Sequence, residues 1–247
     1  MKRLIAIITL ILLCVLSVSA QQVSRDINLL ISQSESAKKS YGVNSDEYLA
    51  SLDSIVQSAF EQQKYDIAFK YRNIHIDIIA NKEGKESLNY AIDLSRLGNI
   101  ASQLHPNNLQ IAIDYHLKAY NLFDKLKVYD HIFYLVTTGQ LSNLYANIGQ
   151  YDLALQYQDK HLMCIKKVEG TSSISYLNAC NVAINIADAA GSNALIDKYS
   201  KEILQNTSKL TNENFANYQF AIYAKHTMLW RQEKYQDTIK TTIDYLA

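Results

Sequence analysis

One short pattern recurs along the chain at a nearly constant interval, and it constrains the fold more than any other feature. The pattern is Tyr-x-x-Ala-x-x-Tyr, and its clearest copy runs from Tyr151 to Tyr157. Copies begin at Tyr65, Leu109, Tyr151, Asn193 and Tyr235, at intervals of 44, 42, 42 and 42 residues. A fixed period of this size predicts stacked supersecondary units, none of which buries its apolar face alone.

The repeating unit is predicted to be a pair of helices. Apolar residues recur at helical spacing, and one Pro and seven Gly are few for a β-rich chain. Five first helices are predicted near 46–61, 87–104, 131–148, 173–189 and 213–231. Their second helices are predicted near 65–81, 108–126, 151–168, 193–207 and from 235 to the end. An amphipathic helix from Val23 to Lys39, ending at Tyr41-Gly42, is expected to precede the pairs.

Turn residues follow the same period. Between pairs they are Gly42, Gly84, Val128, Gly170 and Asn212, and four of these five adopt a left-handed conformation at low cost. Within pairs the turn residues are Gln63, Asn107, Gly149, Gly191 and Glu233. The second pair has two extra residues in its turn, which explains the single interval of 44.

The best-defined repeat resembles a known family. Gly149-Gln-Tyr151-Asp-Leu-Ala154, with Leu141 and Tyr145 ahead of it, resembles the tetratricopeptide repeat. The 42-residue step looks most like the kinesin-light-chain-like variety. The resemblance covers almost all of the chain after the N-terminal segment, and it weakens where Ile196 and Thr238 replace the small Ala. It implies an all-α, right-handed α-solenoid whose first helices line a concave surface.

A polar strip runs along the predicted first helices at the repeat interval. It consists of Gln57, Asn99, Asn143, Asn185 and Thr227. The resemblance implies that such Asn side chains hold the backbone of an extended peptide, since an amide both donates and accepts hydrogen bonds. Flanking positions one turn earlier include Gly139 and Asn181, and one turn later Asn147. The alternative is that these amides tie neighbouring helices together, because buried polar groups must be satisfied.

The N-terminus predicts export. Lys2 and Arg3 precede an apolar run from Leu4 to Leu16 and the small residues before Gln21, so residues 1–20 are interpreted as a signal peptide cleaved after Ala20. The alternative, a transmembrane anchor, is disfavoured because the run is shorter than the roughly 20 residues that span a bilayer. The predicted domains are therefore a signal peptide (1–20), a capping helix and linker (21–45) and a repeat array (46–247), in a secreted or periplasmic protein.

Charge argues against an anionic partner. Cleavage removes two of the 24 basic residues and none of the 24 acidic ones, which leaves a net charge of about −2. Such a balance gives no electrostatic footprint for nucleic acid or an anionic membrane. No segment after the signal peptide is apolar enough to enter a membrane.

Residues with reactive chemistry form no recognisable catalytic or metal motif. Cys164 and Cys180 are interpreted either as one disulfide or as two buried thiols. The equivalent His75 and His161 lack a second ligand at helical spacing. The Tyr series Tyr71, Tyr115, Tyr157 and Tyr199 is expected to pack between helices. No enzyme activity, metal or cofactor is predicted.

The leading functional hypothesis is an exported scaffold that binds a protein or peptide segment in its concave groove. A second hypothesis treats the chain as the sensing or substrate-docking region of a larger enzyme or signalling protein, for example one with a caspase-like domain. It is motivated by the chain's end inside a predicted helix without a polar cap. Self-association of the repeats is a third possibility.

Overall fold

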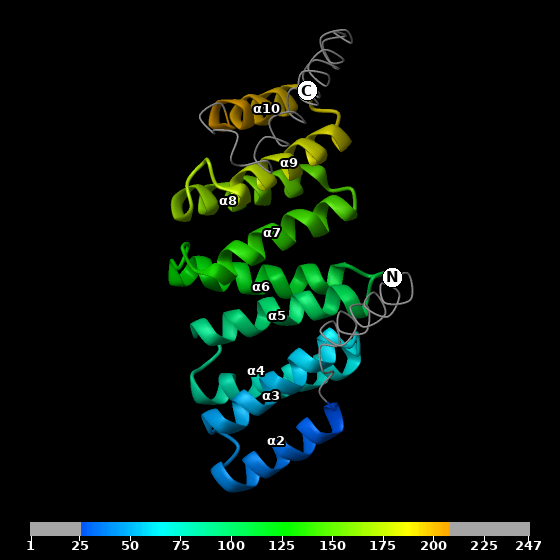
Figure 1. Cartoon of the computed structure of the whole chain (residues 1–247), viewed down its shortest axis with the longest axis vertical. Coiled ribbons are helices and arrows are strands. Elements are labelled where there is room, and N and C mark those ends of the chain that lie inside the picture. Colours follow the sequence, from blue (N-terminus) through cyan, green and yellow to red (C-terminus); the bar gives the residue numbers. More distant parts are fainter. Residues whose placement is uncertain (1–25, 208–247) are drawn as a thin grey trace, which may run out of the picture. The chain divides into compact units, whose positions relative to one another are not determined.

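The computed structural model describes residues 26–207, and the regular secondary structure in this range is entirely α-helical. The described helices succeed one another as antiparallel pairs, which confirms the predicted all-α solenoid class (Figure 1). The chain divides into two compact units, with the boundary between Lys82 and Glu83. That boundary falls between the first and the second helix pair.

The first unit contains three described helices. These are α2 (Ile27–Tyr41), α3 (Asp46–Glu61) and α4 (Tyr65–Lys82), and α3 packs against both of the others. Leu52, Ile55 and Ala59 of α3 are completely buried. The helix α2 therefore packs against the first helix of the first pair.

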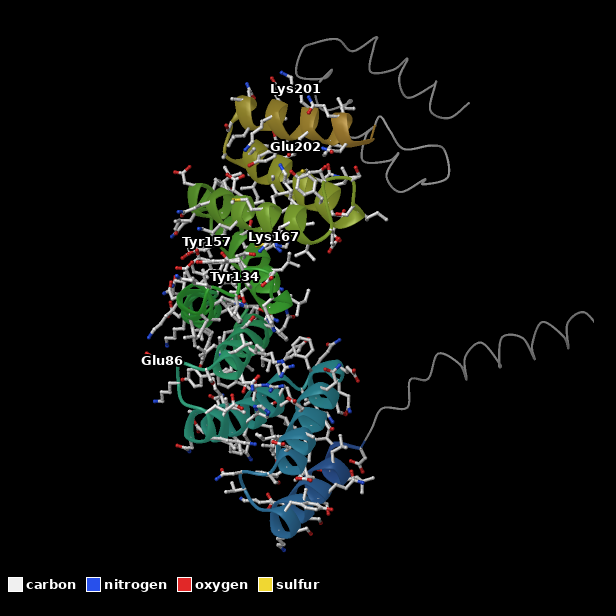
Figure 2. All side chains as sticks on the ribbon, turned by 90° about the vertical axis from the view of Figure 1, so that its left-hand side faces the viewer. Glu86, Tyr134, Tyr157, Lys167, Lys201 and Glu202 are labelled. Atoms are coloured by element: carbon white, nitrogen blue, oxygen red, sulfur yellow. The ribbon has the colours of Figure 1, made fainter. Side chains whose placement is uncertain are left out.

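The second unit contains the remaining described pairs. They are α5 (Leu88–Leu104) with α6 (Gln110–Leu126), α7 (Ile132–Asn147) with α8 (Tyr151–Val168), and α9 (Ile174–Ala189) with α10 (Asn193–Thr207). Each helix packs on the next in chain order, so α5 to α10 form one stack (Figure 1). Side chains fill the layers between them, and the rings of Tyr134 and Tyr157, both labelled in Figure 2, each pack against the ring of Tyr120.

Three of the four described first helices begin with a serine cap. Ser45, Ser87 and Ser173 each lie three residues after a left-handed glycine, and each hydroxyl accepts a hydrogen bond from the backbone N–H three residues later. This satisfies one of the free N–H groups at the helix start. The fourth first helix, α7, uses the His131 ring instead, at 3.2 Å from the N atom of Phe133.

The small residue of each repeat sets how closely the helices approach. Ala68, Ala112 and Ala154 are completely buried, each near the start of a second helix. Ile196 occupies the corresponding position in α10 and is also completely buried. The fourth repeat therefore keeps the burial of this position although its side chain is larger.

The predicted helix bounds agree closely with the structure. Three of the eight paired helices, α3, α8 and α10, begin and end where expected, and the bounds of the others differ by at most two residues. The predicted N-terminal helix starts later than expected, at Ile27 rather than Val23. The signal peptide and the fifth pair lie outside the described residues. Within residues 26–207, no helix has the length and apolar character needed to cross a membrane.

Candidate functional site

The predicted polar strip is found largely at the surface of the first helices. Gln57, Asn143 and Asn185 are exposed, and Asn99 is half-buried. Gln57 belongs to the first unit, where its amide donates to Glu61 Oε1 at 2.6 Å within the same helix. The three Asn residues belong to successive first helices, α5, α7 and α9, of the second unit. Thr227 lies outside the described residues.

A cleft of about 260 Å³ opens between α7 and α9, and two of the predicted site residues line it. Gly139 and Asn143 come from α7, where they are one helical turn apart. The side of α9 contributes Ser175, Asn178, Ala179 and Val182. Gln158, His161 and Ile165 of α8 also line the cleft, so it is built from two consecutive first helices and the second helix between them.

Gly139 makes room for a histidine in this cleft. A Cβ at position 139 would lie 3.0 Å from Cε1 of His161. The ring is held by α7 as well, because Nδ1 of His161 lies 3.0 Å from the carbonyl oxygen of Leu135. Burial lowers the pKa of His161, partly offset by that hydrogen bond and by the nearby carboxylate of Glu169. The ring is therefore neutral near pH 7.

Several amides of the strip make no hydrogen bond to a described residue that would tie neighbouring helices together, whereas Asn185 does take part in an interaction with another residue. Asn143 makes no hydrogen bond to any residue between 26 and 207. The side-chain oxygens of Asn99 and Asn181 are buried and likewise lack a partner in this range. Asn147, the predicted flanking residue one turn after Asn143, is exposed.

Other polar groups connect the helices of this unit. Thr137 of α7 donates to Ser95 of α5 at 2.8 Å, and both side chains are completely buried. Gln158 of α8 donates to the carbonyl oxygen of Ala179 in α9 at 2.7 Å. Ser95 occupies the position equivalent to Gly139, so this position serves packing in one repeat and lines the cleft in another.

A second polar series lies inside the second helices, and the sequence analysis did not identify it. Its members are Arg72, His116, Gln158 and Ser200, at the repeat intervals of 44, 42 and 42 residues, and all are buried. His116 is pressed against Gly98 of α5, where an added Cβ would be 2.6 Å from the ring. Burial lowers the pKa of His116 to about 4. Their spacing at the repeat interval could have revealed this series in the sequence, although the residue types differ.

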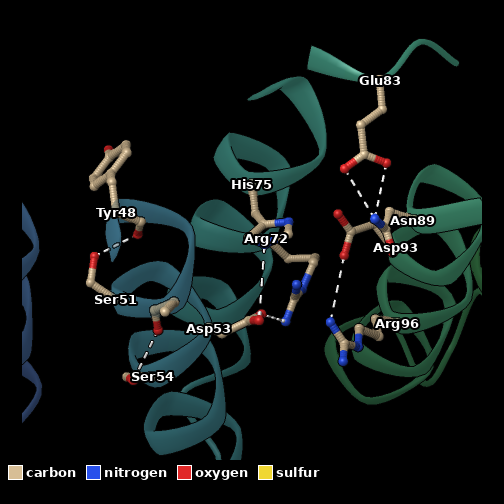
Figure 3. Close-up of polar contacts among 11 residues, drawn as sticks. Tyr48, Ser51, Asp53, Ser54, Arg72, His75, Glu83, Asn89, Asp93 and Arg96 are labelled. Atoms are coloured by element: carbon tan, nitrogen blue, oxygen red, sulfur yellow. Dashed lines mark hydrogen bonds and ion pairs between the residues drawn. The ribbon is translucent and has the colours of Figure 1, made fainter. Parts of the chain in front are cut away.

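In the first unit the residue at the corresponding position, Arg72, forms an ion pair. Nη2 of Arg72 lies 2.7 Å from Oδ1 of Asp53, and His75 Nε2 lies 3.9 Å from the other carboxylate oxygen (Figure 3). Asp53 is half-exposed, whereas Arg72 and His75 are buried. The pair joins α3 to α4 and neutralises a buried guanidinium, as buried charges require.

Several tyrosines of the second unit pack against one another or bond to neighbouring helices. The Tyr157 ring lies 5.6 Å from Tyr145 in a stacked arrangement and 5.4 Å from Tyr120 in an edge-to-face arrangement. Tyr199 is buried and donates to Asp159 Oδ1 at 2.6 Å. These contacts support the packing interpretation of the Tyr series at these two positions.

The two cysteines are free, buried thiols, so the disulfide alternative is not found in the structure. Burial raises the pKa of Cys180 to about 12, and burial also raises that of Cys164. Among residues 26–207 there is no group of three or more His, Cys, Asp or Glu side chains that could hold a metal ion.

Comparison with known proteins finds similarity in structure but no match in sequence. No protein-family model and no curated protein matches the sequence. BtubC (BKLC) from P. vanneervenii has a similar structure, with 17% sequence identity, a TM-score of 0.61, and 78% of this chain and 79% of that chain covered. A Podosopora anserina protein described as a kinesin light chain with nearly identical TPR-like repeats is 15% identical, with a TM-score of 0.63 over 78% of this chain and 92% of that chain.

These similarities cover most of the chain, and the described residues consist of repeated helix pairs of the same kind. At such low sequence identity these similarities are evidence for the fold alone. The chain therefore has the TPR-like repeat fold of kinesin-light-chain-like proteins, as the motif around Tyr151 predicted.

Proposed function

We propose that this protein is a non-enzymatic scaffold that binds an extended segment of a partner protein along the first helices of its second unit. The TPR-like fold supports a protein-interaction role in general. The observation that carries the more specific proposal is the cleft between α7 and α9, which Gly139 and Asn143 of the predicted strip both line.

The chemistry of the strip suits a peptide backbone. An extended segment presents unpaired N–H and C=O groups, and an Asn amide pairs with either. Asn143 is exposed in the cleft and has no hydrogen-bond partner in the described part of the chain. Asn185 is exposed one repeat further along, on α9. The buried oxygens of Asn99 and Asn181 are costly without a donor, and a bound segment is one source of that donor.

The test is a triple substitution of the strip, Asn99→Ala, Asn143→Ala and Asn185→Ala, compared with a matched control. The control replaces Asn121 and Gln156 with Ala, which are exposed amides on the second helices α6 and α8. Both variants and the parent serve as bait in a native extract, and captured proteins are quantified by mass spectrometry. Circular dichroism verifies that helicity is kept.

We expect the strip variant to lose partners that the parent and the control variant both retain. Equal capture by all three proteins would reject the proposal. The same loss in the control variant would also count against it, because it would show that capture does not depend on the first helices.

Export is a separate part of the proposal and rests on residues 1–20 alone. The charged start, the apolar run and the small residues that end at Ala20 support cleavage there. Intact-mass measurement of the protein from its native source tests this. A mature chain that begins at Gln21 is expected, and a chain that retains residues 1–20 would contradict it.

A further inference from the structure

The cleft between α7 and α9 presents hydrogen-bond acceptors. Because a carbonyl oxygen only accepts, the contact between His161 Nδ1 and the Leu135 oxygen places the ring proton on Nδ1. Nε2 of the neutral ring is then an acceptor. It is not among the buried unpaired atoms, and no described residue bonds to it, so it remains accessible beside Gly139.

The cleft also carries a negative charge. Glu169, which ends α8, lines the cleft and is exposed. Its carboxylate makes no ion pair with any residue from 26 to 207. Glu169 and His161 both line the cleft, and the carboxylate acts on the ring electrostatically. Lys and Arg are absent from the lining, so the neutral histidine leaves the carboxylate as the one charged lining group.

Apolar side chains form the remaining wall of the cleft. Leu135 of α7, Ile165 of α8 and Val182 of α9 all line it. A cavity with an apolar wall and acceptors at one side is complementary to a side chain with an aliphatic stem and a cationic head. Lysine and arginine have this form, and they bury the stem while the charged group stays near water or a partner.

We propose that this cleft takes a basic side chain, lysine or arginine, of the segment bound along the first helices. The stem lies against Leu135, Ile165 and Val182, and the cationic head donates hydrogen bonds to Glu169 and His161 Nε2. The inference rests on the proposed binding of an extended segment and adds the chemistry of the residue that anchors it.

The experiment selects binders from a random twelve-residue peptide library displayed on phage, with the full mature chain as the target. The variant Glu169→Gln removes the charge of the cleft. Asp130→Asn is the matched control, because Asp130 is an exposed acidic residue in the corresponding loop of the preceding repeat, between α6 and α7. All three proteins are first compared by circular dichroism.

We expect peptides selected by the parent and by Asp130→Asn to share a basic residue at one position, and those selected by Glu169→Gln to lose this preference. In a selected peptide, replacing the basic residue with norleucine, which keeps an apolar stem, should weaken binding to the parent about tenfold, the value of one charge-assisted hydrogen bond. The same replacement should have little effect with Glu169→Gln.

The outcomes separate the two proposals. Peptides without a basic preference, or a preference that survives in Glu169→Gln, would overturn the basic-anchor inference and leave segment binding intact. Failure to select any peptide with the parent would contradict the proposed function itself, and the inference with it.

Discussion

His116 of α6 lies directly against Gly98 of α5, so closely that a Cβ on residue 98 would be 2.6 Å from the imidazole ring. Neither ring nitrogen has a hydrogen-bond partner among the described residues, and the side chain is completely buried. The contact allows α5 and α6 to approach closely, and it makes the second unit sensitive both to added volume and to acid.

Replacing Gly98 with Ala should destabilise the protein. The added methyl group collides with the ring, and overpacking of this kind costs about 1 to 3 kcal/mol. At the close approach seen here we expect the upper part of this range, which exceeds the roughly 1 kcal/mol by which Ala is favoured over Gly inside a helix. The free energy of unfolding from urea titration measures the effect. In a Gly98→Ala, His116→Ala double variant the cost of the Gly98 change should largely disappear. A gain in stability from Gly98→Ala alone would contradict the packing described here.

Stability should fall in acid because of His116. Burial lowers its pKa in the folded chain to about 4, whereas the unfolded chain keeps the ordinary value near 6.5. Between these values the unfolded state binds the additional proton, so the stabilisation is complete above about pH 6.5 and is lost as the pH falls towards about 4. The part of the free energy of unfolding that is lost in this way through His116 is about 3 kcal/mol.

Urea titrations across this pH range, with His116→Leu as the comparison, measure the contribution. The leucine variant should lose stability less steeply in acid than the parent. Parallel pH profiles for the two proteins would show that His116 titrates normally in the folded chain.

The hydrogen bond between Thr137 and Ser95 should stabilise the contact between α7 and α5. Thr137→Val leaves the buried Ser95 hydroxyl without its partner, which costs about 1 to 3 kcal/mol. Ser95→Ala in the Thr137→Val background should recover part of this loss, since both polar groups are then absent. A double-mutant cycle of unfolding free energies measures the coupling. Strictly additive effects would contradict a direct bond.

The two cysteines should be unreactive in the folded protein. Both are buried, and burial raises their pKa values, to about 12 for Cys180, so little thiolate is present near pH 7. A mature chain labelled with iodoacetamide should react slowly when native and rapidly at both positions when unfolded in urea. Failure to label in urea without reductant would indicate that the two cysteines form a disulfide.

Much of the fold could be predicted because the repeat itself fixes the register. A single well-defined copy around Tyr151 located the turns of weaker copies, including α10, where Ile196 replaces Ala. The glycine before each serine cap marks where three first helices begin. The position of the amide strip followed from the same register.

The interior polar series and the cleft could not be predicted from the sequence as readily. Arg72, His116, Gln158 and Ser200 share a repeat position but not a chemical type, so no residue pattern marks them. The cleft depends on side chains from three helices and on the absence of a Cβ at Gly139. Ser95, at the repeat position equivalent to Gly139, is completely buried and accepts a hydrogen bond from Thr137, which the residue pattern did not predict.

The most direct measurement of the central claim is a crystal structure of the mature chain with a selected peptide. The account predicts an extended peptide along α7 and α9, with its backbone within hydrogen-bonding distance of the Asn143 and Asn185 amides and one side chain in the cleft beside Gly139. A peptide bound to the second helices instead, with both amides in contact only with solvent, would contradict it.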